Sequence, residues 1–195
     1  MRTVFASAAF LILAAGSGLA ADPLGDWLVK DGYAHIRIDN CGGKLWGIVV
    51  WEKEPGLDNE NPDPAKRNRP TLGIPVLMGL AQTRPNKWEG EIYNSNNGKM
   101  YSANISVVDE NTLELEGCLF PNFLCQAQKW TRVKTPPPNA LPLPPLPPQA
   151  APPAPLTKKG TGSAAAKGAP PVQSEVCARV AAEASVVPNT RGASK

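Results

Sequence analysis

The densest group of side chains able to do chemistry lies between Lys53 and Leu72, in a stretch rich in proline and Asx residues. Its carboxylates and amides offer several oxygen ligands, but their spacing lacks the glycine and closing glutamate of an EF-hand calcium loop. Basic residues follow directly, and arginines suit a carboxylate or phosphate ligand. Ion pairs and Asx turns within the loop are the alternative. The residues that we expect to bind a ligand here are Asn61, Asp63, Arg67 and Arg69.

Signs of an enzyme are scarce. His35 is the only histidine, and no G-x-S-x-G nucleophile motif accompanies it. The pairs Glu89 with Glu91 and Glu114 with Glu116 have a spacing compatible with glycoside chemistry, but charges on the solvated face of a strand are the ordinary interpretation. We therefore predict no catalytic residue and a non-enzymatic protein.

Four cysteines indicate disulfides if the chain is exported. Cys118 and Cys125 bracket a short loop that brings two strand ends together, and we predict that they pair. Cys41 and Cys177 remain, and whether they pair with each other stays open. A zinc site is not expected, because there is one histidine and no Cys-x-x-Cys spacing. We predict neither a metal nor a cofactor.

The N-terminus has the three parts of a secretory signal peptide. Arg2 supplies the positive start, an apolar run extends from Val4 to Ala15, and small residues precede Ala20. The run is shorter than the roughly 20 residues that span a bilayer. We predict cleavage after Ala20, a periplasmic location and no transmembrane segment in the mature chain. Cleavage after Ala21 and an uncleaved anchor are the alternatives.

Aromatic residues and prolines divide the rest of the chain. All five tryptophans lie in residues 21–133, which are enough for one small core, whereas residues 134–195 contain no aromatic residue. Residues 134–173 are rich in proline and alanine, and we expect them to form a disordered, polyproline-like linker. Residues 174–195 form a C-terminal tail in which a helical turn or two is expected, but no persistent helix on its own.

The net charge of +3 comes from the C-terminal part. Residues 134–195 carry seven lysines and arginines against two glutamates. Loose attraction of this basic tail to an anionic envelope surface is one interpretation, and solubility of a disordered segment is the other. We expect no nucleic-acid partner, because basic and aromatic residues are not interleaved on any stretch.

Alternating runs and turns predict an all-β domain. From Trp88 to Val108, two such runs flank the turn-rich Asn94 to Gly98, as in a β-hairpin. Lys44 to Glu52 is apolar on both faces, which favours a central or closed sheet. About eight short strands without a convincing helix predict a small antiparallel barrel or sandwich, and closure would remove exposed edges. The expected strands are Trp27–Lys30, Tyr33–Asp39, Lys44–Glu52, Pro75–Gln82, Trp88–Tyr93, Met100–Val108, Thr112–Cys118 and Cys125–Val133.

The two ends of the expected domain resemble those of lipocalins and other calycins. Gly25-Asp26-Trp27 enters the first strand, and Trp130-Thr131-Arg132 lies in the last. In that arrangement the tryptophan covers one end of the barrel and the arginine stacks on it. The resemblance implies structural roles for Trp27 and Arg132.

A wider set of motifs resembles the bacterial exported family called domain of unknown function 2147. The motifs are G-D-W at Gly25, C-G-G-K-L-W-G at Cys41, N-P-D-P-A-K-R-N-R-P-T-L-G at Asn61, W-E-G-E-I-Y-N at Trp88, G-K-M-Y-S-A at Gly98 and Q-K-W-T-R-V at Gln128. The resemblance extends from Leu24 to Val133 and excludes the proline-rich tail. It implies a periplasmic, lipocalin-like β-barrel and no established reaction.

Two functions are compatible with these patterns. The first is binding of a small apolar or amphipathic ligand by Tyr33, Trp51 and the loop from Asn61 to Arg69, because the expected strands are aromatic and catalytic motifs are missing. The second is a structural or interaction module, in which a packed barrel is tethered to the cell envelope by the proline-rich spacer. The volume of the barrel interior distinguishes the two.

Overall fold

The computed structural model describes residues 22–120, 123–135, 137, 140, 142 and 174–185. The signal peptide predicted for residues 1–20, most of the linker predicted for residues 134–173 and the last ten residues lie outside this part. No helix among the described residues is long and apolar enough to cross a membrane.

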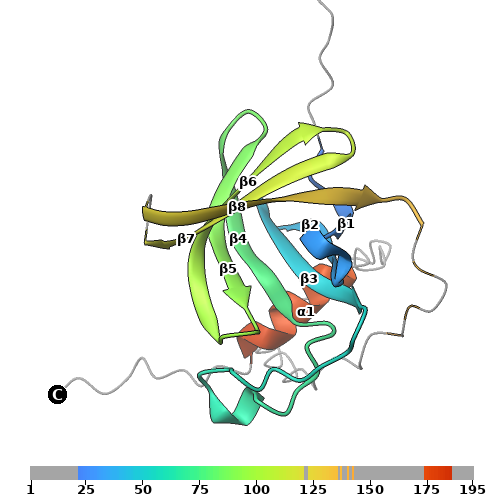
Figure 1. The fold of residues 1–195 in the computed structure, drawn as a ribbon, viewed down its shortest axis with the longest axis vertical. Coiled ribbons are helices and arrows are strands. Elements are labelled where there is room, and N and C mark those ends of the chain that lie inside the picture. The colour runs from blue at the N-terminus through green and yellow to red at the C-terminus, as the bar shows by residue number, and fades with distance from the viewer. Residues whose placement is uncertain are drawn as a thin grey trace, which may run out of the picture.

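Eight antiparallel strands form a closed barrel in which each strand pairs with its neighbours in the sequence and β8 pairs with β1 (Figure 1). The prediction of a lipocalin-like all-β barrel is confirmed. The strands are β1 (Gly25–Leu28), β2 (Ala34–Cys41), β3 (Lys44–Glu52), β4 (Pro75–Arg84), β5 (Lys87–Asn94), β6 (Lys99–Asp109), β7 (Thr112–Phe120) and β8 (Phe123–Val133).

The barrel encloses a continuous apolar core. Alternate residues of each strand point inward, so the core draws side chains from every strand. Trp27, Trp88 and Trp130 are its largest members, and each is at most 9% exposed. Gly47 permits close packing here, because a Cβ atom at this position would lie 2.9 Å from Cγ2 of Ile36.

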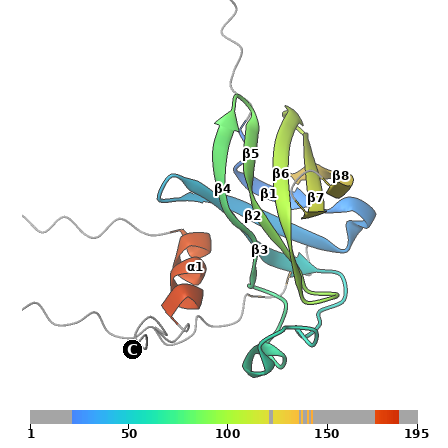
Figure 2. The same cartoon turned by 90° about the vertical axis from the view of Figure 1, so that its left-hand side faces the viewer.

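A helix, α1 (Glu175–Ser185), covers the outer wall of the barrel beside β2, β3 and β4 (Figure 2). Leu45 and Val49 of β3 belong to the barrel core, whereas Ile48 points the other way and is also fully buried. Val176 of α1 is equally buried. One face of β3 therefore packs in the barrel interior, and the other packs toward α1.

This helix is longer and better anchored than local propensity predicts. It contains 11 residues, and Ser174 accepts a hydrogen bond from the backbone N–H of Cys177 at its first turn. A disulfide joins Cys177 to Cys41 at the end of β2. Packing and the cross-link stabilise a segment that would be marginal as an isolated helix.

The strand limits differ from the expected ones chiefly at the start. The first strand ends at Leu28 rather than Lys30, because residues Lys30–Gly32 form a 3-10 turn, η1, in which Asp31 has φ of 71°. The loop between β3 and β4 is irregular, as expected, and contains a second 3-10 turn, η2 (Pro64–Lys66).

Candidate functional site at the loop end of the barrel

One end of the barrel, which we call the closed end, is sealed by an arginine and a tryptophan. The guanidinium of Arg132 lies 4.2 Å from the ring centroid of Trp27. It donates hydrogen bonds to the carbonyls of Asp22, Leu24 and Glu110. The indole N–H of Trp27 donates to the Pro23 carbonyl at 2.8 Å. The chain entering β1 is thereby held across this end, and both residues have the structural roles that the calycin resemblance implies.

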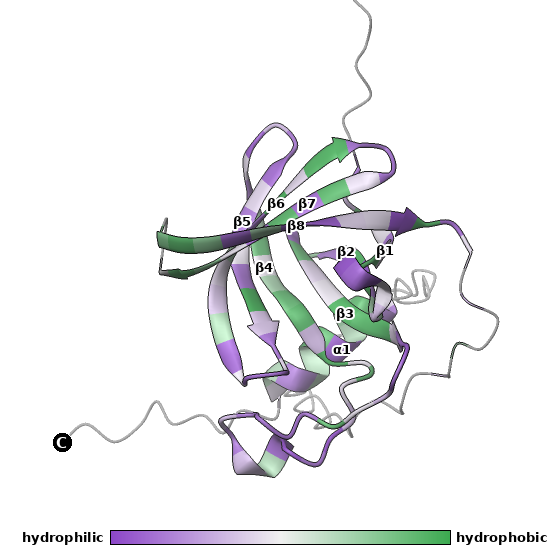
Figure 3. Ribbon diagram, viewed as in Figure 1, coloured by the Kyte–Doolittle hydropathy of each residue, from purple (hydrophilic) through white to green (hydrophobic). Residues whose placement is uncertain are grey.

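The opposite end, which we call the loop end, carries the connections β1–β2, β3–β4, β5–β6 and β7–β8 (Figure 1). Large apolar side chains exposed to solvent gather there, whereas only Val108 of this group lies near the closed end. Figure 3 shows the hydrophobic residues at the end of the β7–β8 hairpin. The exposed apolar residues of the loop end are Tyr33, Leu57, Met100, Leu119, Phe123 and Leu124.

Two of the residues predicted to bind a ligand lie at this end, beside His35. Trp51 packs against His35, with ring centroids 4.6 Å apart. Tyr33 is 58% exposed, and the ammonium of Lys53 lies 5.7 Å from its ring centroid. Burial lowers the pKa of His35, although the charge of Asp26 acts in the opposite direction.

The loop between β3 and β4 is organised around the buried carboxylate of Asp58, which is fully inaccessible to solvent. The hydroxyl of Tyr93 donates to it at 2.5 Å, the amide of Asn61 donates at 2.7 Å, and Arg69 donates twice, at 2.9 and 3.0 Å. Burial, followed by the nearby Asp58 carboxylate, raises the pKa of Tyr93 to about 12. The carboxylate is thus satisfied by side chains from a strand and from both halves of the loop.

Other polar residues of this loop are also occupied by structural contacts. Asp63 caps η2 by accepting a hydrogen bond from the N–H of Ala65 at 3.0 Å. The side chain of Asn61 accepts from the N–H of Asp63, and Arg67 donates to the Asn61 carbonyl at 2.8 Å. The four loop residues predicted to bind a ligand therefore form one network. Among the described residues, no hydrogen bond joins this network to Tyr33 or Trp51.

Helix α1, near the C-terminus, contributes Glu183 to the same network. The carboxylate of Glu183 lies 2.5 Å from the ammonium of Lys66 and 2.6 Å from the guanidinium of Arg69. Burial alone would favour the neutral carboxyl, but the hydrogen bonds and charges of Lys66 and Arg69 together lower the pKa of Glu183. The C-terminal helix and the loop are thereby joined by an ion-pair network.

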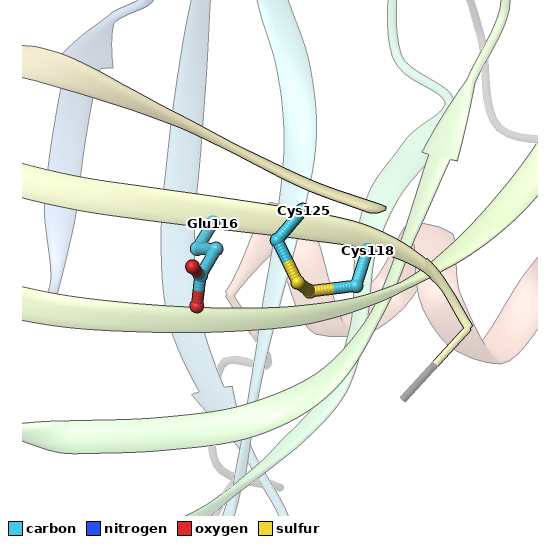
Figure 4. Close-up of side chains that lie close together, drawn as sticks. All are labelled: Glu116, Cys118 and Cys125. Atoms are coloured by element: carbon cyan, nitrogen blue, oxygen red, sulfur yellow. A yellow bond between two sulfur atoms is a disulfide. The ribbon is translucent and has the colours of Figure 1, made fainter. Parts of the chain in front are cut away.

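Near the tip of the β7–β8 hairpin, Glu116 lies beside Cys118 and Cys125 (Figure 4). The two sulfur atoms form a disulfide, as the short loop between them suggested. Glu116 accepts a hydrogen bond from the amide of Asn104 at 2.7 Å. A cysteine binds a metal through its thiolate, and the disulfide leaves neither sulfur in that form, so Cys118 and Cys125 act here as a covalent cross-link of the hairpin.

The fold defines the class to which the protein belongs, the lipocalin-like β-barrels. Protein HP1028 from the human pathogen Helicobacter pylori, described as belonging to the lipocalin family, is similar, with a TM-score of 0.55 and 19% sequence identity. The similarity covers 58% of this chain and 84% of that chain. At this identity it shows the fold alone.

The chain itself belongs to the bacterial family described as "Uncharacterized protein conserved in bacteria (DUF2147)", whose model matches residues 25–132. The match covers the barrel almost completely and stops before the linker and α1. A search of curated proteins finds no match to this chain.

Sequence reasoning did not find two parts of this end. The segment Cys118 to Cys125 is largely apolar between its cysteines, where a hairpin turn is usually polar, and that contrast is a signal for an exposed apolar tip. The contact of Glu183 with Arg69 had no comparable signal, because it depends on where α1 docks.

Proposed function

We propose that this protein is an exported, non-enzymatic barrel that binds a small apolar or amphipathic ligand at its loop end. The observation that carries the proposal is the gathering of exposed apolar side chains at that end, opposite an end sealed by Trp27 and Arg132. Large apolar side chains exposed at one end of a barrel are compatible with a binding site there.

In this proposal the ligand lies at the rim of the barrel, because core side chains fill the interior. Trp27, Trp88 and Trp130 occupy the interior together with aliphatic side chains from all parts of the sheet. A ligand that enters from the loop end would meet Tyr33 and Trp51 before it reached this core.

In this proposal most polar residues of the β3–β4 loop hold the loop in place and do not contact the ligand themselves. Asn61 and Arg69 both donate to Asp58, and Asp63 caps a turn. These residues hold the loop that carries Leu57, whereas Arg67 keeps an exposed side chain beside it. An amphipathic ligand with a carboxylate or phosphate group would find its counter-charge at Arg67.

Two disulfides support an oxidising compartment, and with the signal-like N-terminus they favour the periplasm. The barrel's membership in a family of uncharacterised proteins and its lipocalin-like fold support binding over catalysis. The packed core also favours the second candidate, a structural or interaction module that holds no ligand.

Native mass spectrometry of protein isolated from its own host tests for a bound ligand directly. A fluorescent amphipathic probe, 1-anilinonaphthalene-8-sulfonate, then tests the position of the site. Tyr33→Ser or Leu57→Ser should weaken probe binding by roughly five- to tenfold, the loss expected when about half of one apolar side chain is buried against the probe.

Val108→Ser is the matched control, since Val108 is 56% exposed, close to the 58% of Tyr33, but lies near the closed end. Its probe affinity should equal that of the unaltered protein. An apoprotein without ligand, together with equal effects of the three substitutions, would favour the interaction module instead.

A further inference from the structure

Helix α1 is held on the barrel by one disulfide and a small set of contacts. The disulfide joins Cys177, in the first turn of the helix, to Cys41 at the end of β2. The buried residues of the helix are Val176, Arg179 and Ala182. An isolated helix of 11 residues is marginal in water. Without the disulfide, these few contacts would have to hold a segment that only residues 134–174 connect to β8.

The same helix contacts the β3–β4 loop at two points. The carboxylate of Glu183 lies 2.6 Å from the guanidinium of Arg69, which also binds the buried Asp58. The guanidinium of Arg179 lies against Gly73, where an added Cβ atom would be 2.5 Å from Nη1. The position of α1 is thereby coupled to the core of the loop and to its last residues before β4.

The barrel wall beneath α1 is apolar. The helix contacts β2, β3 and β4 on the outside of the barrel (Figure 2). Ile48 of β3 points away from the core and is nevertheless fully buried, as is Val176 of the helix. Departure of α1 would therefore expose apolar surface on the wall and on the helix.

The surroundings of the Cys41–Cys177 disulfide favour exchange with a thiol. Cys41 is half-buried and is followed by the exposed turn residues Gly42 and Gly43, so a small thiol has an approach to its sulfur. Attack at Sγ of Cys41 expels Cys177 as a thiolate in the first turn of α1. Backbone N–H groups and the helix dipole stabilise a negative charge at this position, and a stabilised thiolate leaves more readily.

The Cys118–Cys125 disulfide has the opposite surroundings. Cys125 is exposed, but Cys118 is only 5% exposed, so attack at Cys125 would expel a buried thiolate. An oxygen of Glu116 also lies within 4.8 Å of both sulfur atoms. Its negative charge would repel the attacking thiolate and disfavour the one that leaves. The two disulfides should therefore differ in their rates of reduction.

We propose that the Cys41–Cys177 disulfide is a redox switch that a dithiol opens, which releases α1 from the barrel wall and loosens the β3–β4 loop. One thiolate of the dithiol attacks Sγ of Cys41, the S–S bond breaks, and its electron pair leaves with Sγ of Cys177. The second thiolate of the dithiol then attacks the first sulfur of the dithiol in the mixed disulfide and frees Cys41. The dithiol ends as a disulfide, and its two protons end on the two cysteines.

Release of the helix changes two regions of the protein. Ile48 loses its cover, and Arg69 loses one of its two carboxylates. Because the β3–β4 loop also carries Leu57, the effect extends to the loop end of the barrel. The switch itself requires no bound ligand.

Differential alkylation of the full mature chain, with both disulfides formed, tests the chemistry. The folded protein is incubated with dithiothreitol, and free thiols are trapped with iodoacetamide and located by peptide mass spectrometry. Cys41 and Cys177 should be trapped at least tenfold faster than Cys118 and Cys125. Glu116→Gln should narrow this difference, because it should accelerate reduction of the second disulfide alone.

Hydrogen–deuterium exchange tests the conformational result. Protein reduced only at Cys41 and Cys177 should exchange faster in residues 58–73 and 175–185 than the oxidised protein, and residues 87–109 should be unchanged. The double variant Cys41→Ser with Cys177→Ser, which carries no alkyl group, should reproduce this change. The matched control, Cys118→Ser with Cys125→Ser, should leave exchange in both segments as it is in the unaltered protein.

Two kinds of result would overturn the proposal. The first is trapping of Cys118 and Cys125 as fast as, or faster than, the other pair. The second is unchanged exchange in α1 and in residues 58–73 after selective reduction, since the helix would then have stayed docked. Both measurements are independent of ligand binding at the loop end.

Discussion

The carboxylate of Glu183 lies 2.6 Å from the guanidinium of Arg69, although the two residues are 114 positions apart. Arg69 in turn holds the buried Asp58, so the C-terminal helix and the core of the β3–β4 loop are linked through a single arginine. A chain that ended with β8 would leave this arginine without one of its two carboxylates.

Glu183→Gln should therefore loosen both the helix and the loop. We expect a loss of about 1–2 kcal/mol of unfolding free energy, together with faster amide exchange in residues 58–69. Because the folded-state pKa of Glu183 is lowered, its stabilisation is present above the ordinary glutamate pKa and disappears as the pH falls through the folded value.

Urea unfolding of the unaltered protein and the variant at pH 7 and pH 3 checks this. The difference between them should be large at pH 7 and small at pH 3. Glu175→Gln, on the same helix, replaces a carboxylate that is 42% exposed and lies 3.2 Å from the guanidinium of Arg179, so it should cost less than Glu183→Gln. Equal effects of the two substitutions would contradict the role of Glu183.

Tyr93→Phe should be destabilising although it removes one oxygen atom. The hydroxyl donates to Asp58 at 2.5 Å and accepts from Asn61 at 3.1 Å, so its loss leaves a buried carboxylate with one donor fewer. We expect a cost of about 1–3 kcal/mol, measured by chemical unfolding at pH 7.

The same hydroxyl gives a signature at high pH. Because the pKa of Tyr93 is raised to about 12, its contribution to stability is complete below pH 10 and is lost as the pH rises toward 12. The unaltered protein should thus lose more stability than Tyr93→Phe over this range. Tyr33→Phe, which alters an exposed phenol, should behave like the unaltered protein.

The two disulfides should contribute different amounts to the free energy of unfolding. Cys41 and Cys177 close a loop with a sequence separation of 136, and Cys118 and Cys125 close one with a separation of 7. Loop-closure entropy gives roughly 4–5 kcal/mol for the first and about 2 kcal/mol for the second. The double serine variants should follow this order in thermal unfolding, and only loss of the first should expose α1 to limited proteolysis.

Gly47→Ala tests the packing of the barrel wall. Its new Cβ would lie 2.9 Å from Ile36 and 3.0 Å from Leu77, both of which are buried. Overpacking of this kind costs about 1–3 kcal/mol. At Gly117 the nearest atom to a new Cβ is 3.7 Å away, so Gly117→Ala should change the melting temperature little.

Much of the fold was predictable because its signals are local. Alternation gave eight strands, and the turn from Asn94 to Gly98 closes the β5–β6 hairpin, where the N–H of Gly98 donates to Asn94. The stacking of Arg132 on Trp27 followed from a resemblance that extends over both ends of the domain. The end of β1 was placed too late, because a positive φ at Asp31 is not encoded by alternation.

The candidate site was less predictable, because its contacts are long-range. Asp58 and Tyr93 are 35 positions apart and meet only when the β3–β4 loop folds over the end of β5. The sequence indicated ion pairs and Asx turns within this loop as one alternative, but not which of its groups pair. The docking of α1 likewise depends on a disulfide whose pairing the sequence left open.

The pairing of Cys41 with Cys177 changes what the proline-rich segment is able to do. The segment follows β8 and precedes α1, and the disulfide joins α1 to β2, so the segment is covalently linked to the barrel at both of its ends. A protease that cuts the segment once would leave the two pieces of the chain joined by the disulfide. They would migrate together in non-reducing electrophoresis and separate only after the disulfide is reduced.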